Sequence, residues 1–126
     1  MARKQVIRAD GMPKQLGPYS HAVRAGDLLF VSGQAGVDPA TGAAPADFAA
    51  QARLAFANLV AVLRAAGSGP EHVVKTTVYL ADATKFAEVN ELFAATFPTD
   101  PPARATPVVA LPRGLLISIE CVAVMP

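Results

Sequence analysis

The chain has 126 residues, of which 52% are hydrophobic and 17% are charged, and its 11 Lys and Arg against 10 Asp and Glu give a net charge of +1. This length predicts a single domain, residues 1–126, that is large enough to bury a core. The balanced charge, with basic residues scattered singly, excludes the basic stripe typical of nucleic-acid binding, so we expect no nucleic-acid partner.

The cysteine and histidine content argues against an intrachain disulfide and against a metal site. Cys121 has no second cysteine to pair with, and His21 and His72 complete no metal-ligand spacing, which predicts a reducing compartment and no metal. Residues 1–6 are not followed by an apolar run, and the apolar stretches fall short of the roughly 20 residues that cross a bilayer. We therefore expect a cytoplasmic protein without a targeting segment or membrane contact. We also expect the side chains of both histidines to be solvated.

The first half of the chain predicts a hairpin, a loop and a helix. Two strand-like runs within residues 22–31 flank Gly26-Asp27, a two-residue turn. Residues 37–42 are dense in turn-forming residues. A helix then begins after Asp47, a good N-cap, and keeps one apolar stripe to Ala66 before Gly67 ends it.

The second half predicts a strand, a helix and two strands. Residues 73–80 are rich in β-branched side chains and predict a buried strand. The helix after it ends at Pro98. Residues 104–111 and 115–125 predict two strands joined at residues 112–114. One face of the second helix carries Phe86, Val89, Phe93 and Phe97.

This order of elements predicts an α+β domain, with both helices packed on one face of a mixed sheet. The strand at residues 73–80 lies between the two helices, so its neighbours through crossovers should run parallel to it. The apolar content with few charges also predicts a homo-oligomer, because a small monomer would expose large apolar patches.

The triplet Pro102-Ala103-Arg104 places one guanidinium on a stiff turn between the end of a helix and the start of a strand. Arginine matches a carboxylate with two parallel hydrogen bonds and keeps its charge. A small 2-oxo or 2-imino acid is the kind of ligand that Arg104 could hold. The alternative is a structural ion pair with Asp100, Glu91 or a neighbouring subunit.

With four further motifs, this triplet resembles the RidA (YjgF/YER057c/UK114) family of enamine/imine deaminases. The resemblance implies a chorismate-mutase-like fold with a six-stranded mixed sheet and two helices packed on one face, in a homotrimer with ligand clefts between subunits. It also implies hydrolysis of 2-imino acids to 2-oxo acids and ammonia, without a metal or organic cofactor. The resemblance spans about Lys4 to Met125, and the further motifs are Gly17-Pro18-Tyr19-Ser20, Val31-Ser32-Gly33-Gln34, Val73-Val74-Lys75-Thr76-Thr77-Val78 and Leu111-Pro112-Arg113-Gly114.

The resemblance implies that Arg104 binds the substrate carboxylate and that Tyr19 walls the cleft from a neighbouring subunit. Ser32 and Gly33 follow an apolar strand, where a hydroxyl and a close backbone approach could meet a ligand. The alternatives are a Tyr19 that anchors its loop to the core and a buried Ser32 that bonds to its own strand.

Asn90 and Thr106 complete the substrate-facing candidates. Asn90 lies beside the apolar face of the second helix, where a buried amide would serve as a structural clip or a ligand contact. The resemblance places it around the site. Thr106 follows Arg104 by two residues, and its backbone carbonyl could position a water.

Ser118 stands where deaminating members of the family carry the glutamate that handles protons and water. Serine is too weak an acid or base to replace a carboxylate directly. Glu120 lies on the same face of the predicted strand, but two residues along it, or about 6.5 Å. Glu120 could act only through a bridging water, and the alternative is a surface or interface charge.

Three functions are compatible with these residues. The first is a deaminase with Arg104, Ser118 and Thr106 in the catalytic site and Tyr19, Ser32, Gly33 and Asn90 binding the imino or oxo acid. The second is a non-deaminating member that binds a small carboxylate as a regulatory module or acts on a different imine or amide. The third is a ribonuclease or translation inhibitor, which the near-zero net charge disfavours.

Overall fold

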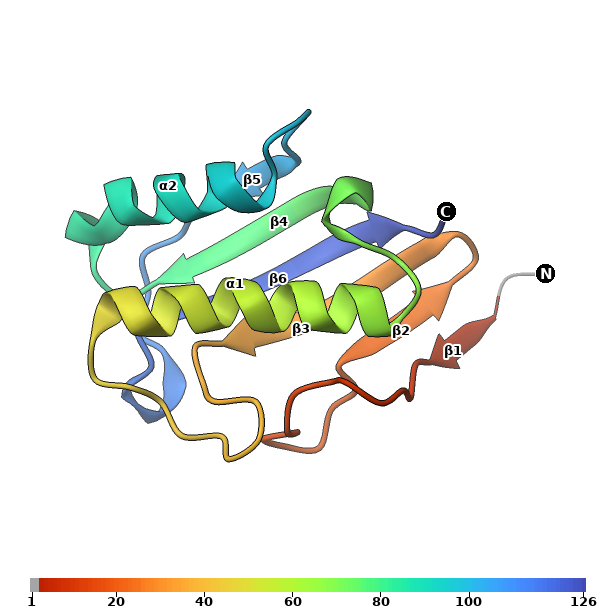
Figure 1. Cartoon of the computed structure of the whole chain (residues 1–126), viewed down its shortest axis with the longest axis horizontal. Helices are drawn as coiled ribbons and strands as arrows, with labels where there is room; N and C mark the ends of the chain where they lie inside the picture. Colours follow the sequence, from red (N-terminus) through yellow and green to blue (C-terminus); the bar gives the residue numbers. More distant parts are fainter. Residues whose placement is uncertain (1–2) are drawn as a thin grey trace.

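The computed structural model describes residues 3–126. Its elements are β1 (Lys4–Val6), β2 (Ala22–Ala25), β3 (Leu28–Ala35), α1 (Phe48–Ala65), β4 (Val73–Leu80), α2 (Phe86–Thr96), β5 (Ala103–Ala105) and β6 (Ile117–Val124), with short 3-10 turns at Pro70–His72, Ala83–Lys85 and Pro112–Gly114. The six strands form one mixed sheet in the order β1-β2-β3-β6-β4-β5. Both α-helices lie on the same side of this sheet, which confirms the predicted α+β fold (Figure 1).

The two crossover connections differ from each other. β4 and β5, joined through α2, pair in parallel as predicted, with Thr76 opposite Arg104. β3 and β4, joined through α1, are not neighbours, because β6 lies between them and pairs antiparallel with both. The prediction of parallel neighbours was therefore right for one crossover and wrong for the other, since the last strand enters the middle of the sheet by a non-local pairing.

Helix α1 begins where its cap predicts. The side chain of Asp47 accepts a hydrogen bond from the backbone N–H of Ala50 at 3.0 Å, and Gly67 takes a φ of +85° just beyond the end. We expected no apolar stretch long enough to cross a bilayer, yet within residues 3–126 helix α1 is long and apolar enough by length and composition alone, with a mean hydropathy of 1.2 over 18 residues. Half of this window is buried in the fold, as in the core helix of a domain.

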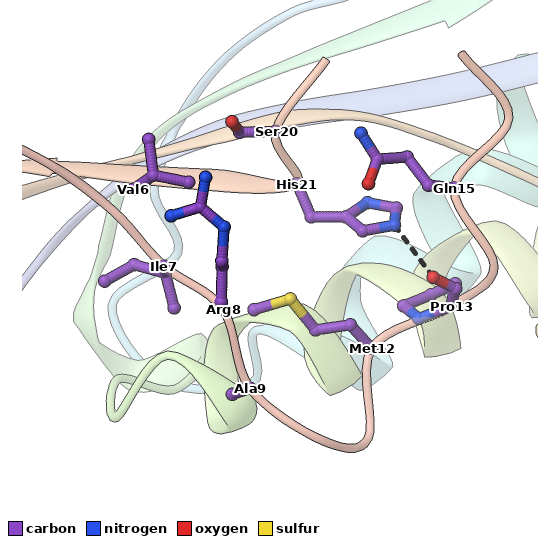
Figure 2. Close-up of a pocket in the computed structure, with 9 residues that line it drawn as sticks. All are labelled: Val6, Ile7, Arg8, Ala9, Met12, Pro13, Gln15, Ser20 and His21. Atoms are coloured by element: carbon purple, nitrogen blue, oxygen red, sulfur yellow. Dashed lines mark hydrogen bonds between the residues drawn. The ribbon is translucent and has the colours of Figure 1, made fainter. Parts of the chain in front are cut away.

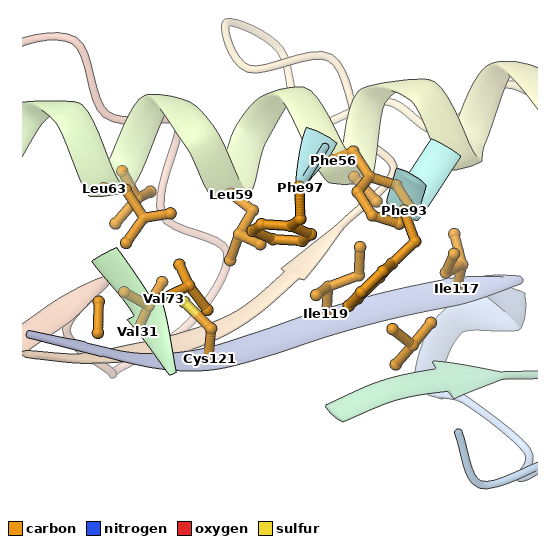
Figure 3. Packing of buried hydrophobic residues seen from close by; sticks show 14 of the residues in the cluster. Val31, Phe56, Leu59, Leu63, Val73, Phe93, Phe97, Ile117, Ile119 and Cys121 are labelled. Atoms are coloured by element: carbon orange, nitrogen blue, oxygen red, sulfur yellow. The ribbon is translucent and has the colours of Figure 1, made fainter. Parts of the chain in front are cut away.

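The core lies between the helices and the sheet (Figure 3). Leu59 and Leu63 of α1 face Ile119 and Cys121 of β6, and all four are buried. Cys121 packs as a small core residue, as expected. Its burial raises the pKa of the thiol to about 12.

Two predicted features of the second half are wrong. The strand predicted at residues 104–111 is only the three residues of β5, because Pro107 has no N–H to continue the ladder and pairing returns only as an isolated bridge at Val108. Phe86 was predicted on the apolar face of the second helix, but it is 43% exposed. It occupies the first position of α2 and packs against the guanidinium of Arg104, with 5.2 Å between that group and the ring centroid.

Within residues 3–126, no helix lies on the other face of the sheet (Figure 1). Residues of β6 alternate between buried and half-buried, so Ser118 and Glu120 lie on this open face. Leu28, Phe30 and Val74 are each more than 40% exposed on the strands beside it. An apolar, uncovered sheet face is the feature that a protein partner or a second copy normally covers.

Gly36, the residue after β3, tests how closely this part of the chain approaches α1. A Cβ added at Gly36 would lie 2.1 Å from the backbone oxygen of Gln51, and helix backbone cannot move aside cheaply. We expect Gly36→Ala to lower the free energy of unfolding by about 1–3 kcal/mol, which denaturant titration measures. The exposed loop variant Ala40→Ser should change it by less than about 0.5 kcal/mol. Equal stability of the two variants would contradict this packing.

Candidate functional site

A cavity of about 310 Å³ brings four of the predicted site residues together: Tyr19, Ser32, Gly33 and Ser118. It opens beside β3 and β6 and is walled by the turn that precedes β6. Most of the remaining wall is apolar, and it consists of Leu16, Ala35, Leu111, Pro112, Arg113 and Leu115.

A β-bulge positions Ser32 and Gly33. The register between β3 and β6 shifts between Val31 and Gln34, so these two residues leave the regular ladder. The Ser32 hydroxyl donates to the carbonyl of Ser20, which leaves its oxygen as an acceptor toward the cavity. A Cβ at Gly33 would lie 2.8 Å from Ser118 Oγ, so only glycine leaves room for the serine there.

The loop that carries Tyr19 is fixed by His21, which is only 7% exposed rather than solvated as expected. His21 Nε2 donates to the carbonyl of Pro13 at 2.8 Å (Figure 2), so Nδ1 is the acceptor and takes a hydrogen bond from Gln34 Nε2 at 3.1 Å. Gln34 Nε2 also donates to the carbonyl of Ser32. The ring of Tyr19 meets the ring of His21 edge-on, and this network therefore ties Tyr19 to Ser32.

Arg104 lies at the edge of the sheet against α2, not in the cavity of Ser118. Its guanidinium donates to Asn90 Oδ1 at 2.8 Å and lies 4.8 Å from the ring centroid of Phe93. Asn90 is exposed and not buried as expected, yet it does contact Arg104. No carboxylate of residues 3–126 pairs with this guanidinium, so the alternative of an ion pair with Asp100 or Glu91 is not present within the chain.

The surroundings of Arg104 are stiff. The buried Thr76 of β4 donates from its hydroxyl to the carbonyl of Ala103, which fixes β5 at the sheet edge. Prolines follow α2 and precede β5 and, with Asn90, Phe93 and Arg104, they line a second cavity of about 470 Å³. The guanidinium is therefore held in place while its other donors stay open to a ligand.

One chain does not bring Arg104 to Ser118. Ser118 pairs with Tyr79 on the open face, whereas Arg104 pairs with Thr76, which is buried toward the helices. The Cα atoms of Ser118 and Arg104 lie two strand spacings apart across the sheet and three residues apart along it, which gives a separation of about 14 Å. Their side chains also lie on opposite faces of the sheet, so the predicted residues form two separate groups.

Two further candidates lie outside both cavities. Glu120 is half-buried and accepts a hydrogen bond from the Tyr79 hydroxyl, and this bond is the main cause of a raised pKa of Tyr79. Glu120 is thus occupied by Tyr79 and lines neither cavity. Thr106 is half-buried after β5 and also lines neither of them.

Arg113 was not among the predicted site residues, yet it lines the cavity of Ser118. Arg113 lines the cavity with Ser118 and takes a φ of +60°, a left-handed conformation that is uncommon outside glycine. The motif Leu111-Pro112-Arg113-Gly114 was used as a turn between two strands and as part of the family resemblance, and Arg113 itself was given no place in the site. Residues 3–126 contain no cluster of three or more His, Cys, Asp or Glu side chains that could hold a metal ion.

Gly33 tests whether the cavity depends on this close packing. We expect Gly33→Ala to displace Ser118 and to weaken binding of 2-oxobutanoate, measured by calorimetry, without loss of the fold. The double variant Gly33→Ala/Ser118→Ala removes the clashing oxygen and should recover most of the lost affinity. Equal affinity of Gly33→Ala and the parent protein would show that the ligand does not use this cavity.

Comparison with known proteins gives one consistent family. The family model described as Endoribonuclease L-PSP matches residues 10–125. The chain is 48% identical to Protein DfrA of Myxococcus xanthus, over 98% of this chain and 97% of that protein. It is 43% identical to the 2-iminobutanoate/2-iminopropanoate deaminase of Mus musculus, over 96% of this chain and 91% of that protein.

Solved structures agree with these relatives. The structure of RidA from the Antarctic bacterium Psychrobacter sp. PAMC 21119 superposes with a TM-score of 0.90 at 41% identity, over 96% of this chain and 99% of that one. The yjgF gene product of E. coli superposes with a TM-score of 0.86 at 40% identity, over 97% and 99% of the two chains. The sequence motifs, the fold and these matches together show that the chain belongs to the RidA family.

Proposed function

We propose that this protein is a deaminase that hydrolyses 2-imino acids to 2-oxo acids and ammonia. The observation that carries the proposal is the guanidinium of Arg104, which Asn90 and two phenylalanine rings hold without neutralising its charge. Such a group suits the carboxylate of a 2-imino acid. The names of the mouse and rat relatives, both 2-iminobutanoate/2-iminopropanoate deaminase, support the same reaction.

The proposed site forms between two copies of the chain in a homotrimer. Arg104 and Asn90 belong to one group of residues, and Tyr19, Ser32 and Ser118 belong to another on the opposite face of the sheet. A ligand that uses both groups therefore needs a second copy. The uncovered face with Leu28, Phe30 and Val74 supplies apolar surface for that association.

The reaction needs a water molecule placed against the imine carbon. The water oxygen forms a bond to C2 and loses one proton to solvent, while the π-electron pair of C2=N moves to nitrogen and takes a proton. The hydroxyl of this tetrahedral intermediate then loses its proton to solvent and the nitrogen takes a second proton. The C2–N bond breaks, and ammonia leaves as the C2=O bond forms. Arg104 fixes the carboxylate through both steps, and the oxygen of Ser32 is free to accept a hydrogen bond from the water or the N–H group.

Ser118 sets how this chain handles protons. Its hydroxyl can orient the water, but it cannot remove a proton at neutral pH as a carboxylate does. Neither the residues that line the cavity of Ser118 nor those that line the cavity of Arg104 include an Asp, Glu or His. We infer that protons pass between solvent water and the substrate nitrogen, which makes the reaction slower than with a carboxylate in place.

The absence of an acid from the lining residues also favours a second candidate function, a module that binds a small carboxylate without turnover. Both functions use Arg104 in the same way, and they differ only in the release of product.

The family model carries the description Endoribonuclease L-PSP. The net charge of +1 and the missing acid–base pair do not support cleavage of RNA by this chain.

Arg104 gives the first functional test. We expect Arg104→Ala to weaken binding of 2-oxobutanoate at least about 30-fold, because the ligand carboxylate loses its charged partner. Deaminase activity toward 2-iminobutanoate generated in situ should fall by a similar factor. Sedimentation of the variant should match the parent protein, since Arg104 contacts α2 and not the open sheet face. Unchanged affinity would remove the central assignment.

Ser118 separates the two candidate functions. We expect slow release of 2-oxobutanoate by the parent protein and a gain of about 100-fold or more in Ser118→Glu, since a positioned general acid or base contributes at least that factor. Ser118→Gln introduces a side chain of the same size as glutamate but without an ionisable group, so it is the matched control and should give no gain. Binding without turnover in the parent protein, followed by turnover in Ser118→Glu, would support the binding module. A slower Ser118→Glu would contradict the role given to this position.

A further inference from the structure

The cavity of Ser118 contains a charged group that the proposed reaction does not use. Arg113 is the one charged residue among those that line this cavity. Across residues 3–126, its guanidinium makes no ion pair and no hydrogen bond. An unpaired cation beside an apolar wall is suited to an anionic ligand group.

The backbone holds Arg113 at this position. Its φ of +60° is followed by a φ of +66° at Gly114, and Pro112 precedes it in the short 3-10 turn before β6. A non-glycine residue in the left-handed region costs about 1 kcal/mol or more and persists only where its surroundings impose it. The side chain of Arg113 therefore starts from a fixed place at the rim of the cavity.

The residues that line the cavity of Arg104 and those that line the cavity of Ser118 carry positive charge and no negative charge. Arg104 is the charged residue among those lining its cavity, Arg113 is the charged residue lining the other, and no Asp or Glu lines either one. A ligand that spans both groups meets two guanidinium groups and no carboxylate. Electrostatic complementarity favours a dianion with one anionic group at each end.

We propose that Arg113 forms a second anion subsite, and that the substrates are 2-imino dicarboxylates, which are the imines of acidic amino acids. This inference rests on the proposed function, since Arg104 must hold the first carboxylate. The far carboxylate then meets Arg113, with Ser118 near the reacting carbon. A class of enzymes that oxidises acidic amino acids at the α-carbon would supply such substrates.

The test uses two pairs of stable or semi-stable 2-oxo acids that differ only at the far end. 2-Oxoglutarate is compared with 2-oxopentanoate, and oxaloacetate with 2-oxobutanoate, by calorimetry on the intact oligomer. We expect each dicarboxylate to bind at least about fivefold more tightly than its partner. Arg113→Gln should abolish this preference and leave the monocarboxylate affinity within twofold, whereas Arg113→Lys should keep part of it.

Two controls make the outcome specific. Arg64→Gln removes an equal charge at an exposed position of α1 and should leave the preference unchanged. Ser118→Glu adds an anion to the cavity that Arg113 lines and should reduce the preference. A preference for monocarboxylates, or a dicarboxylate preference that survives Arg113→Gln, would overturn the subsite. If Arg104→Ala weakens all four ligands in that case, the proposed function still stands, whereas four unchanged affinities would overturn both.

Discussion

Alternation along β6 is the constraint on which the rest of the structure depends. Every second residue from Ile117 is buried under α1 and α2, so the intervening residues, Ser118 among them, must face the open side of the sheet. A slip of one residue would place Ser118 in the core and Ile119 on the open face. The packing of Ile117 and Ile119 in the core therefore decides on which face of the sheet Ser118 and its cavity lie. It also decides that Arg104, which faces the helices from β5, belongs to a different group of residues.

Local patterns predicted most of the fold. The cap at Asp47, the stop at Gly67 and the β-branched run of β4 each depend on neighbouring residues, and their boundaries agree with the structure to within a residue or two. The insertion of β6 between β3 and β4 was not predicted from those patterns, because it joins segments that are far apart in the sequence. The short length of β5 follows from Pro107, whose effect on an edge strand the apolar pattern of residues 104–111 concealed.

Some of the predicted site residues lie together in the structure, but their arrangement was not predicted. Tyr19, Ser32, Gly33 and Ser118 do meet in one cavity, and Asn90 does meet Arg104. Burial of His21 was missed, because its partners Pro13 and Gln34 are 8 and 13 residues away and no local pattern marks them. A Pro-Arg-Gly turn predicts an arginine in solvent, and Arg113 is indeed exposed, but it also lines the cavity of Ser118. Glu120 was considered as a substitute for a missing carboxylate, but Tyr79 occupies it, which only the paired strands reveal.

The central claim is that a ligand bridges Arg104 of one copy and the cavity of Ser118 in another. Binding of 2-oxobutanoate to mixed oligomers tests it most directly. Arg104→Ala removes one group, Ser118→Phe fills the other, and neither variant alone should bind the ligand. Co-expression in equal amounts should restore binding to about a quarter of the chains, the fraction of interfaces in the proposed cyclic trimer that combine two intact halves. Mixed oligomers that bind no ligand would contradict a site shared between two copies.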